Sequence, residues 1–330
     1  MRKFIVLITT ILFCQLAIAQ HMSAADQKFL SLKEDSLKEQ SMKIILAINS
    51  GDRLSADSLF TRILVRALRN PYSFRYPFDS VQAVSHLYAP DSSFRIFTWQ
   101  LVINENVVRQ HGAIQMRTKD GSLKLFPLSD RSDVTTAIQD TVANNQGWIG
   151  AVYYRIIQNK RGVQNVYTLL GYDEFSIKCD RKIMEVLTFN NGEPIFGGSY
   201  FNMPADNLSS QRNIKRYVME FKKEAGPRLT YDPEMNMVIA EHLVSEAGDP
   251  NKKWTLVGDG DYEGFKWENG AWMHINKVYN YITPLGQEPI PKPLRDNGGN
   301  LNENKLNDQD DEKPVEKPKP VKSTKKGGQN

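Results

Sequence analysis

The sequence is poor in cysteine and histidine, and it has almost no excess of charge. Its 330 residues include two cysteines and five histidines, and the 42 basic and 38 acidic side chains leave a net charge of +4. A disulfide scaffold is excluded, because Cys14 lies in a segment that we expect to be removed and Cys179 alone cannot form an intramolecular bridge. We expect Cys179 to be a buried, inert thiol. The small charge excess gives no reason to expect nucleic acid as a partner.

Motifs that carry familiar chemistry are also missing. The chain contains no Gly-x-Ser-x-Gly elbow, no His-Glu-x-x-His and no Walker loop, and its histidines are not spaced as metal ligands. No catalytic residue and no cofactor is therefore predicted. A hydrolase stays open as an alternative, because paired carboxylates meet in space rather than in sequence. The carboxylates considered for it are Asp173, Glu174, Asp259 and Asp261.

The first 19 residues are typical of a secretory signal peptide. Arg2 and Lys3 precede an apolar segment, 4–16, and Ala17 and Ala19 supply the small residues of a cleavage site. A membrane anchor is the alternative, but the apolar segment is short for a bilayer span. We therefore expect cleavage after Ala19, export to the periplasm or beyond, and no transmembrane span in the mature chain.

The C-terminal end is predicted to be disordered. Residues 286–330 are rich in Pro, Lys, Asp and Asn and contain too few apolar residues to compensate for the entropy of ordering. Acidic residues dominate 296–312 and basic residues dominate 313–330. The tail could adhere to an anionic envelope polymer, or it could be a solvated extension without a specific partner. Residues 20–290 have no net charge.

Residues 20–90 are predicted to form a helical lead. Apolar residues recur at helical spacing from 25 to 69, which favours two helices that form a hairpin with one apolar side. Gly51 is expected to end the first helix, and Asn70-Pro71 the second. A third short helix is predicted from Ser80 to Tyr88.

Residues 91–285 are predicted to form an antiparallel β domain. Three pairs with glycine in second place, Asp120-Gly121, Asn191-Gly192 and Asn269-Gly270, are typical of two-residue hairpin turns. The segment Asn159–Gly162 is expected to join two further strands as a longer hairpin. One helix is expected behind Ser132, because Val134, Ile138 and Val142 are spaced by four. The strands predicted away from these turns are 94–102, 107–116, 150–158, 163–172, 215–221, 237–243 and 254–257.

The third turn permits a residue-by-residue register. With Asn269-Gly270 as the loop, Trp267 pairs with Trp272 and Phe265 with His274, so that all four side chains share one face. This face has two interpretations. It is either an aromatic binding platform for sugar or peptide, or a cross-strand cluster that stabilises the hairpin.

The segment Gly258–Gly264 is the most motif-like part of the chain. Asp259, Asp261 and Glu263 begin a series that resembles a calcium loop, but Gly270 occupies the place of the bidentate glutamate of an EF-hand. A looser calcium site formed by these three carboxylates is one hypothesis. A solvated acidic turn is the other.

Four stretches resemble a group of exported proteins of unknown function from Bacteroidetes-type bacteria. The resemblance extends over roughly residues 75–280 and implies no activity and no functional residue. The stretches are DSSFRIFTWQ at 91–100, GWIGAVYY at 147–154, YTLLGYD at 167–173, and YEGFKW at 262–267 with GAW at 270–272.

Together these features predict an α+β protein that is mainly β. A helical hairpin precedes an antiparallel β meander, which closes into a sandwich or a barrel, and a disordered tail follows. The function that we favour is an exported, non-enzymatic binding or cell-envelope-associated module. The alternatives are a secreted glycan or peptide hydrolase and a calcium-stabilised β module.

Overall fold

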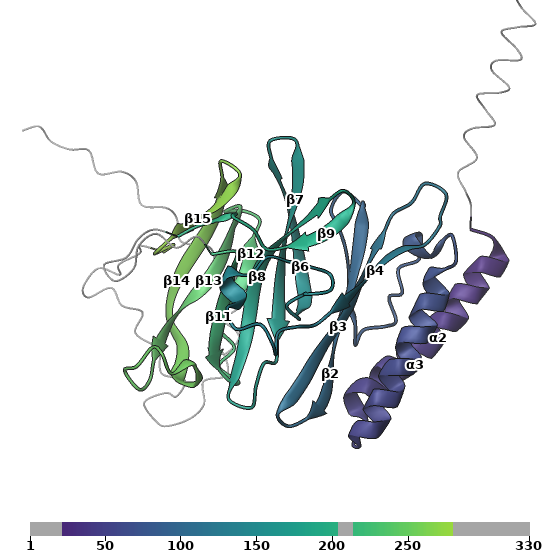
Figure 1. Cartoon of the computed structure of the whole chain (residues 1–330), viewed down its shortest axis with the longest axis horizontal. Coiled ribbons are helices and arrows are strands. Elements are labelled where there is room, and N and C mark those ends of the chain that lie inside the picture. Colours follow the sequence, from purple (N-terminus) through teal and green to yellow (C-terminus); the bar gives the residue numbers. More distant parts are fainter. Residues whose placement is uncertain (1–21, 204–213, 280–330) are drawn as a thin grey trace, which may run out of the picture. The chain divides into compact units, whose positions relative to one another are not determined.

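The computed structural model describes residues 22–203 and 214–279 (Figure 1). The predicted signal peptide, 1–19, and the predicted tail, 286–330, lie outside these ranges. Within them the chain forms two long helices and then a series of almost entirely antiparallel strands in three sheets. This is the predicted fold class.

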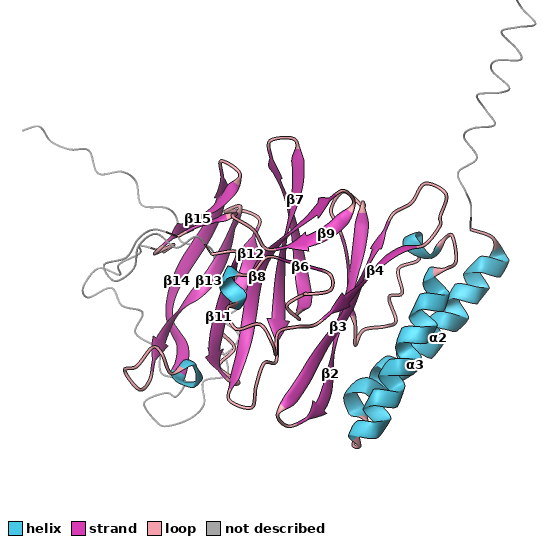
Figure 2. Ribbon diagram, viewed as in Figure 1, coloured by secondary structure: helices cyan, strands magenta, loops and turns pink. Residues whose placement is uncertain are grey.

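The two helices form the predicted hairpin (Figure 2). They are α2 (Ala24–Leu46) and α3 (Ser50–Leu68). The Ser23 hydroxyl accepts a hydrogen bond from the Asp26 N–H at 3.1 Å and so caps α2. The prediction that Gly51 ends the first helix is wrong. Ala47 already has an extended backbone, and Gly51 lies in the first turn of α3, where a new helix has begun.

The helices cover one face of a four-stranded sheet, which we call sheet 1. The side chains of Phe97, Trp99 and Leu101 pack against the helices. The predicted helix from Ser80 to Tyr88 is absent, because its last four residues pair with β2 and thereby satisfy their backbone groups in a sheet. The strands of sheet 1, in spatial order, are β1 (Ser85–Tyr88), β2 (Phe94–Asn104), β3 (Val107–Met116) and β4 (Lys124–Ser129).

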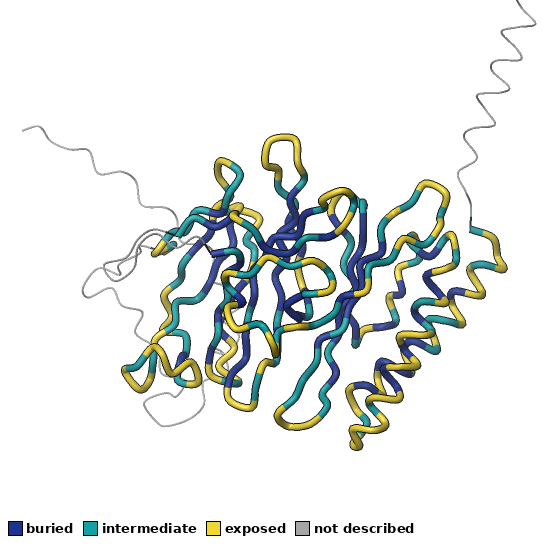
Figure 3. Tube along the Cα trace, in the orientation of Figure 1, coloured by how far each residue is buried: buried dark blue, intermediate teal, exposed yellow. Residues whose placement is uncertain are grey.

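Sheet 2 lies between two other layers and is buried on both faces (Figure 3). On β7, Leu169 packs toward sheet 1 and Leu170 toward sheet 3. A strand that is buried on both faces has a continuous run of apolar residues in its sequence, without alternation of apolar and polar residues. The strands of sheet 2 are β5 (Ala143–Asn144), β6 (Val152–Arg161), β7 (Gln164–Asp173), β8 (Cys179–Asn190), β9 (Glu193–Phe196) and β11 (Arg216–Lys222).

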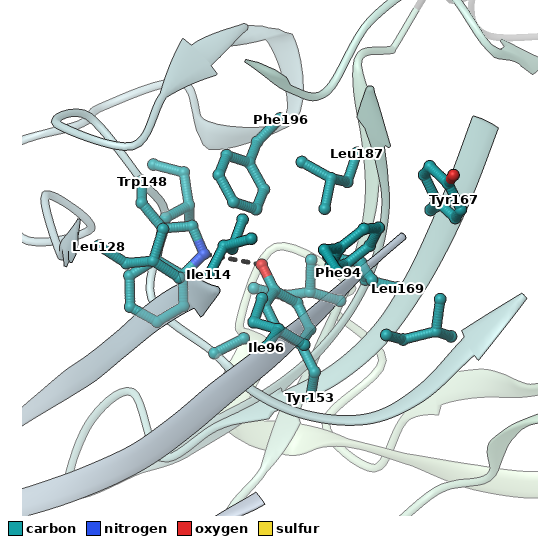
Figure 4. Packing of buried hydrophobic residues seen from close by; sticks show 14 of the residues in the cluster. Phe94, Ile96, Ile114, Leu128, Trp148, Tyr153, Tyr167, Leu169, Leu187 and Phe196 are labelled. Carbon is teal, nitrogen blue, oxygen red and sulfur yellow. Dashed lines mark hydrogen bonds between the residues drawn. The ribbon is translucent and has the colours of Figure 1, made fainter. Parts of the chain in front are cut away.

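The core between sheets 1 and 2 surrounds a buried pair of polar aromatics (Figure 4). The Trp148 indole N–H donates to the Tyr153 hydroxyl at 2.7 Å, and this hydroxyl donates in turn to Glu185. Both rings are fully buried. The hydrogen bonds satisfy groups that would otherwise be costly to bury.

Sheet 3 covers the other face of sheet 2. Its strands are β10 (Phe201–Asn202), β12 (Leu229–Asp232), β13 (Met237–Ser245), β14 (Leu256–Glu268) and β15 (Ala271–Ile275). The pairing of β10 with β15 is parallel, a departure from the predicted meander. The prediction of an acidic turn at Gly258–Gly264 is wrong, because this segment is part of β14. Its irregularity is local: Gly260 has φ +86° where β14 and β13 change register.

Two of the three glycine turns are confirmed. Asn191-Gly192 and Asn269-Gly270 have positive φ at both positions and join strands in the predicted register. Asp120-Gly121 instead lies in a loop of seven residues between Met116 and Lys124, because only the glycine adopts positive φ.

Two other predictions need correction. The hairpin expected at Asn159–Gly162 turns at Gly162 and Val163, since Arg161 still pairs with Gln164. The helix expected behind Ser132 is reduced to η2 (Ile138–Asp140), a single turn of 3-10 helix. The spacing of apolar residues by four does not mark the buried face of a helix here, because Ile138 is buried whereas Val134 and Val142 are exposed.

Candidate functional site

A cleft of about 470 Å³ lies beside β11, and we call it the β11 cleft. Four consecutive residues of β11, Tyr217–Glu220, line it. The segment 136–140, which includes η2, forms one wall. Residues of β13 and β14 form the other, and η3 (Lys253–Thr255) contributes Lys253.

The cleft follows a strand edge that is unpaired in the described part of the chain. There β11 pairs with β8 alone. The Lys223 N–H donates to the Lys178 carbonyl at 2.9 Å, in register with the ladder. Since hydrogen-bonded positions alternate along an antiparallel pair, Tyr217, Met219 and Phe221 direct their backbone groups toward β8. Val218 and Glu220 therefore direct theirs away from β8, to the cleft side.

Sheet 3 has two histidines near the cleft, each next to a carboxylate, and of these four residues His242 and Glu263 line the cleft. His242 Nδ1 lies 2.8 Å from Asp259 Oδ2, and His274 Nε2 lies 2.9 Å from Glu263 Oε2. Glu263 Oε1 lies 3.9 Å from His242 Nε2, so Glu263 stands between the two rings. The β-bulge of β13 against β14 brings Asp259 to His242, because the register shifts after Glu241.

The charges of this wall affect its neighbours. Burial acts to raise the pKa of Asp259, but hydrogen bonds from His242 and from the Asp261 N–H outweigh it, and the pKa lies below its ordinary value. Burial raises the pKa of Tyr217, and the negative charge of Glu263 adds to this effect. Tyr217 therefore stays a neutral hydrogen-bond donor at physiological pH.

A buried ion pair holds the opposite wall in place. Arg216 Nε donates to Glu185 Oε2 at 3.0 Å, and both side chains are fully buried. The same guanidinium donates to the carbonyls of Ile138 and Thr141. The Lys215 N–H also donates to the Gln139 carbonyl at 2.7 Å. The segment 136–140 is thus fixed to β11, and the cleft has two rigid sides.

The three carboxylates of the predicted calcium site have different partners. Asp259 contacts His242, Glu263 contacts His274, and Asp261 Oδ2 lies 3.0 Å from Lys277 Nζ. Across residues 22–203 and 214–279, no group of three or more His, Cys, Asp or Glu side chains is arranged to hold a metal ion. The structure gives no support to a shared cation, and calcium binding stays a prediction.

The predicted aromatic face exists as a cluster of side chains. The rings of Trp267 and Trp272 are 5.3 Å apart, and those of Phe265 and His274 are 5.2 Å apart. Phe265 and Trp272 are buried in the core between sheets 2 and 3, and the Trp272 N–H donates to Thr168 Oγ1. Trp267 is only partly exposed. A ligand that stacks on open rings would find little surface here.

The carboxylates considered for hydrolysis do not gather at the aromatic hairpin. Asp173 accepts a hydrogen bond from Gln110 of β3, and Glu174 accepts one from Gln100 of β2. Both therefore face sheet 1, whereas Asp259 and Asp261 belong to sheet 3.

Of the candidate residues named from the sequence, Glu263 lines the β11 cleft, but it was considered there as a calcium ligand. Val218, Tyr217 and His242 belong to no motif and were not identified. The strand itself was predicted at 215–221. That it forms an edge depends on the pairing of distant segments, for which the local sequence contains no signal.

Comparison with known proteins gives no relative from which a role could be transferred. No family model matches the chain, and neither a curated protein nor a solved structure does. None of the helices in the described ranges combines the length and the apolar character that crossing a membrane requires.

Proposed function

We propose that the protein is a peptide-binding module that takes up an extended segment as an additional strand on β11. The observation that supports this proposal is an edge inside a cleft that no strand of residues 22–203 and 214–279 pairs with, and the backbone groups of Val218 and Glu220 are directed into that cleft. Strand addition obtains its affinity from main-chain hydrogen bonds. Proteins usually protect their sheet edges, and an edge left open between two fixed walls is suited to an extended partner.

The walls define the side chains that such a peptide should carry. Alternate residues of an added strand face opposite sides. On the sheet 3 side they meet Glu263, His242 and the phenol of Tyr217. The carboxylate favours a hydrogen-bond donor, and in particular lysine or arginine, at one of these positions. On the opposite side, the peptide side chains meet Arg181, whose Nε lies 3.0 Å from Glu220 Oε2. This charged pair favours small polar side chains at those positions of the peptide.

The proposal is tested with a phage-displayed library of random heptapeptides. Retained peptides are synthesised, and their affinity is measured by calorimetry. Val218→Pro removes the outward N–H and should weaken binding about tenfold, the loss of roughly one good hydrogen bond. Val218→Ala is the matched control, because it shortens the side chain and keeps the N–H. Equal affinity of the two variants would contradict strand addition.

A second measurement does not depend on the folding of a variant. Each amide of a retained peptide is N-methylated in turn, and the affinity for the wild-type chain is measured. An added strand should lose affinity at every second position, because only alternate peptide groups face β11. Loss at all positions or at none would rule the proposal out.

We also propose that the chain is exported, with cleavage after Ala19. The n-region, the apolar segment and the small residues at positions 17 and 19 support it. Mass spectrometry of the protein recovered from the envelope and the medium should give a mature chain that begins at Gln20. Recovery of the intact N-terminus from the cytoplasm would refute the proposal.

A further inference from the structure

A second cavity lies between α3 and sheet 1, on the face of sheet 1 turned away from sheet 2. Its volume is about 790 Å³. We call it the α3 groove. Its side on α3 consists of Asp57, Ser58, Thr61 and Arg62, which share one helix face. None of these residues contributes to the β11 cleft.

A buried carboxylate forms the deep end of the α3 groove. Asp57 is 7% exposed, and its Oδ1 accepts a hydrogen bond from the Trp99 indole N–H at 2.7 Å. The same oxygen lies 2.9 Å from His111 Nδ1. The pairing of β2 with β3 places Trp99 directly opposite His111, so the sheet holds both partners of Asp57 side by side.

This arrangement determines the orientation of the imidazole. A carboxylate can only accept a hydrogen bond, and Nδ1 of His111 is therefore the protonated nitrogen. The other nitrogen, Nε2, is left for a ligand. The His111 side chain is 34% exposed, and it lines the groove together with Gly112.

A positive charge lies on the rim of the groove. Arg62 is exposed and donates from Nε to the Ser58 carbonyl at 3.2 Å. Its two terminal nitrogens make no hydrogen bond within the part of the chain that the structure describes. The hydroxyl of Thr61 lies on the same helix face. A guanidinium, an imidazole and hydroxyls are the groups that proteins use to bind carboxylate and phosphate.

We propose that the α3 groove binds a small ligand through an oxyanion, a carboxylate or a phosphate group, held between His111 and Arg62. The anion accepts hydrogen bonds from the terminal nitrogens of Arg62 and from Nε2–H of a protonated His111. The side chain of Pro127 offers an apolar surface for the remainder of the ligand.

A bound anion favours the protonated form of the His111 imidazole. When an anion lies next to it, a proton on Nε2 is stabilised by the anion on one side and by Asp57, through Nδ1–H, on the other. The further charged groups that face His111 are Arg62 on α3 and Arg109, which lies two residues away on β3 and is paired with Asp133 at 2.8 Å. The facing residue of β2, Trp99, and that of β4, Ser129, are uncharged.

The test is calorimetric titration of the purified chain with inorganic phosphate and, separately, with sodium acetate at constant ionic strength. The tighter of the two anions identifies the ligand class. We expect binding in the millimolar range or tighter, and about tenfold weaker binding at pH 8 than at pH 6. The enthalpy should vary with the ionisation enthalpy of the buffer, which reports the proton taken up.

Three variants and one spectrum complete the experiment. Arg62→Gln and His111→Gln should each weaken binding about tenfold. Arg66→Gln removes another exposed arginine of α3, outside the groove, and should bind as the wild type does. In the wild type, the anion should shift the imidazole resonances of His111, a readout that needs no substitution. Absence of binding, or binding that neither pH nor these variants change, would overturn the proposal.

Discussion

The buried carboxyl group of Asp173 should make the stability of the protein fall as the pH rises. Asp173 is 4% exposed, accepts one hydrogen bond from Gln110 at 3.1 Å, and has no partner for Oδ2 among the described residues. Burial raises its pKa from 3.8 to about 7; Arg181 opposes the rise, and Asp130 adds to it. The folded protein therefore binds this proton more tightly than the unfolded chain does.

The sign and the size of the effect follow from linkage. Between the unfolded and the folded pKa, unfolding releases a proton and becomes more favourable as the pH increases. From pH 5 to pH 8, pKa values of about 4 and 7 correspond to a loss of roughly 2.5 kcal/mol in the free energy of unfolding. Asp173→Asn cannot ionise. Its stability relative to the wild type should therefore rise by this amount over the same interval.

The assay is urea unfolding of wild type and variant at pH 5, 6, 7 and 8, with the difference in free energy of unfolding plotted against pH. Asp79→Asn is the matched control, because Asp79 is exposed, and its difference from the wild type should stay constant. A constant difference for Asp173→Asn as well would show that this carboxyl does not keep its proton in the folded state.

Three further experiments have defined outcomes. Arg216→Met removes the ion-pair partner of the buried Glu185 and should cost about 3–5 kcal/mol in urea unfolding, and the double variant with Glu185→Leu should recover part of this loss. Burial raises the pKa of Cys179, so a thiol reagent at pH 7.5 should modify it only as fast as the protein unfolds, and rapid modification of the folded protein would contradict this. Gly270→Ala should lower stability by about 1 kcal/mol, because φ is +79° in the turn, whereas Gly51→Ala on α3 should not lower it.

The three glycine turns show when the local sequence is enough to predict the structure of a turn. Asn191-Gly192 and Asn269-Gly270 combine residues that tolerate positive φ with strands that can pair directly on either side. At Asp120-Gly121 the aspartate carboxylate accepts a hydrogen bond from the Ser122 N–H and shapes a wider loop. Asp-Gly is similar to Asn-Gly as a dipeptide, but here the hydrogen bond to the aspartate side chain stabilises a different turn.

Layer order could not be predicted from the strands themselves. Residues on both sides of β7 are apolar, and periodicity therefore does not tell which face meets which neighbour. Arg216 and Glu185 illustrate the same limit. Each looks like a solvated charge in the sequence, and only their pairing across β11 and β8 explains why both are buried.

The candidate sites depend even more on distant contacts. Asp57 and His111 are 54 positions apart, and His242 meets a carboxylate from the following strand only because of a bulge. A single sequence has no local signal for either contact. The aromatic hairpin was predicted in correct register, because one turn and five residues on each side determine it.

The double burial of sheet 2 also bears on how the chain can be made. One face of its strands is covered by β2 and β3, which precede them, and the other by β13 to β15, which follow. A growing chain that has just completed β8 carries Val166, Leu170 and Met184 with nothing yet to cover them. The core cannot close until the last strand has been synthesised, so the nascent chain exposes apolar surface for a long period, and such surface favours aggregation.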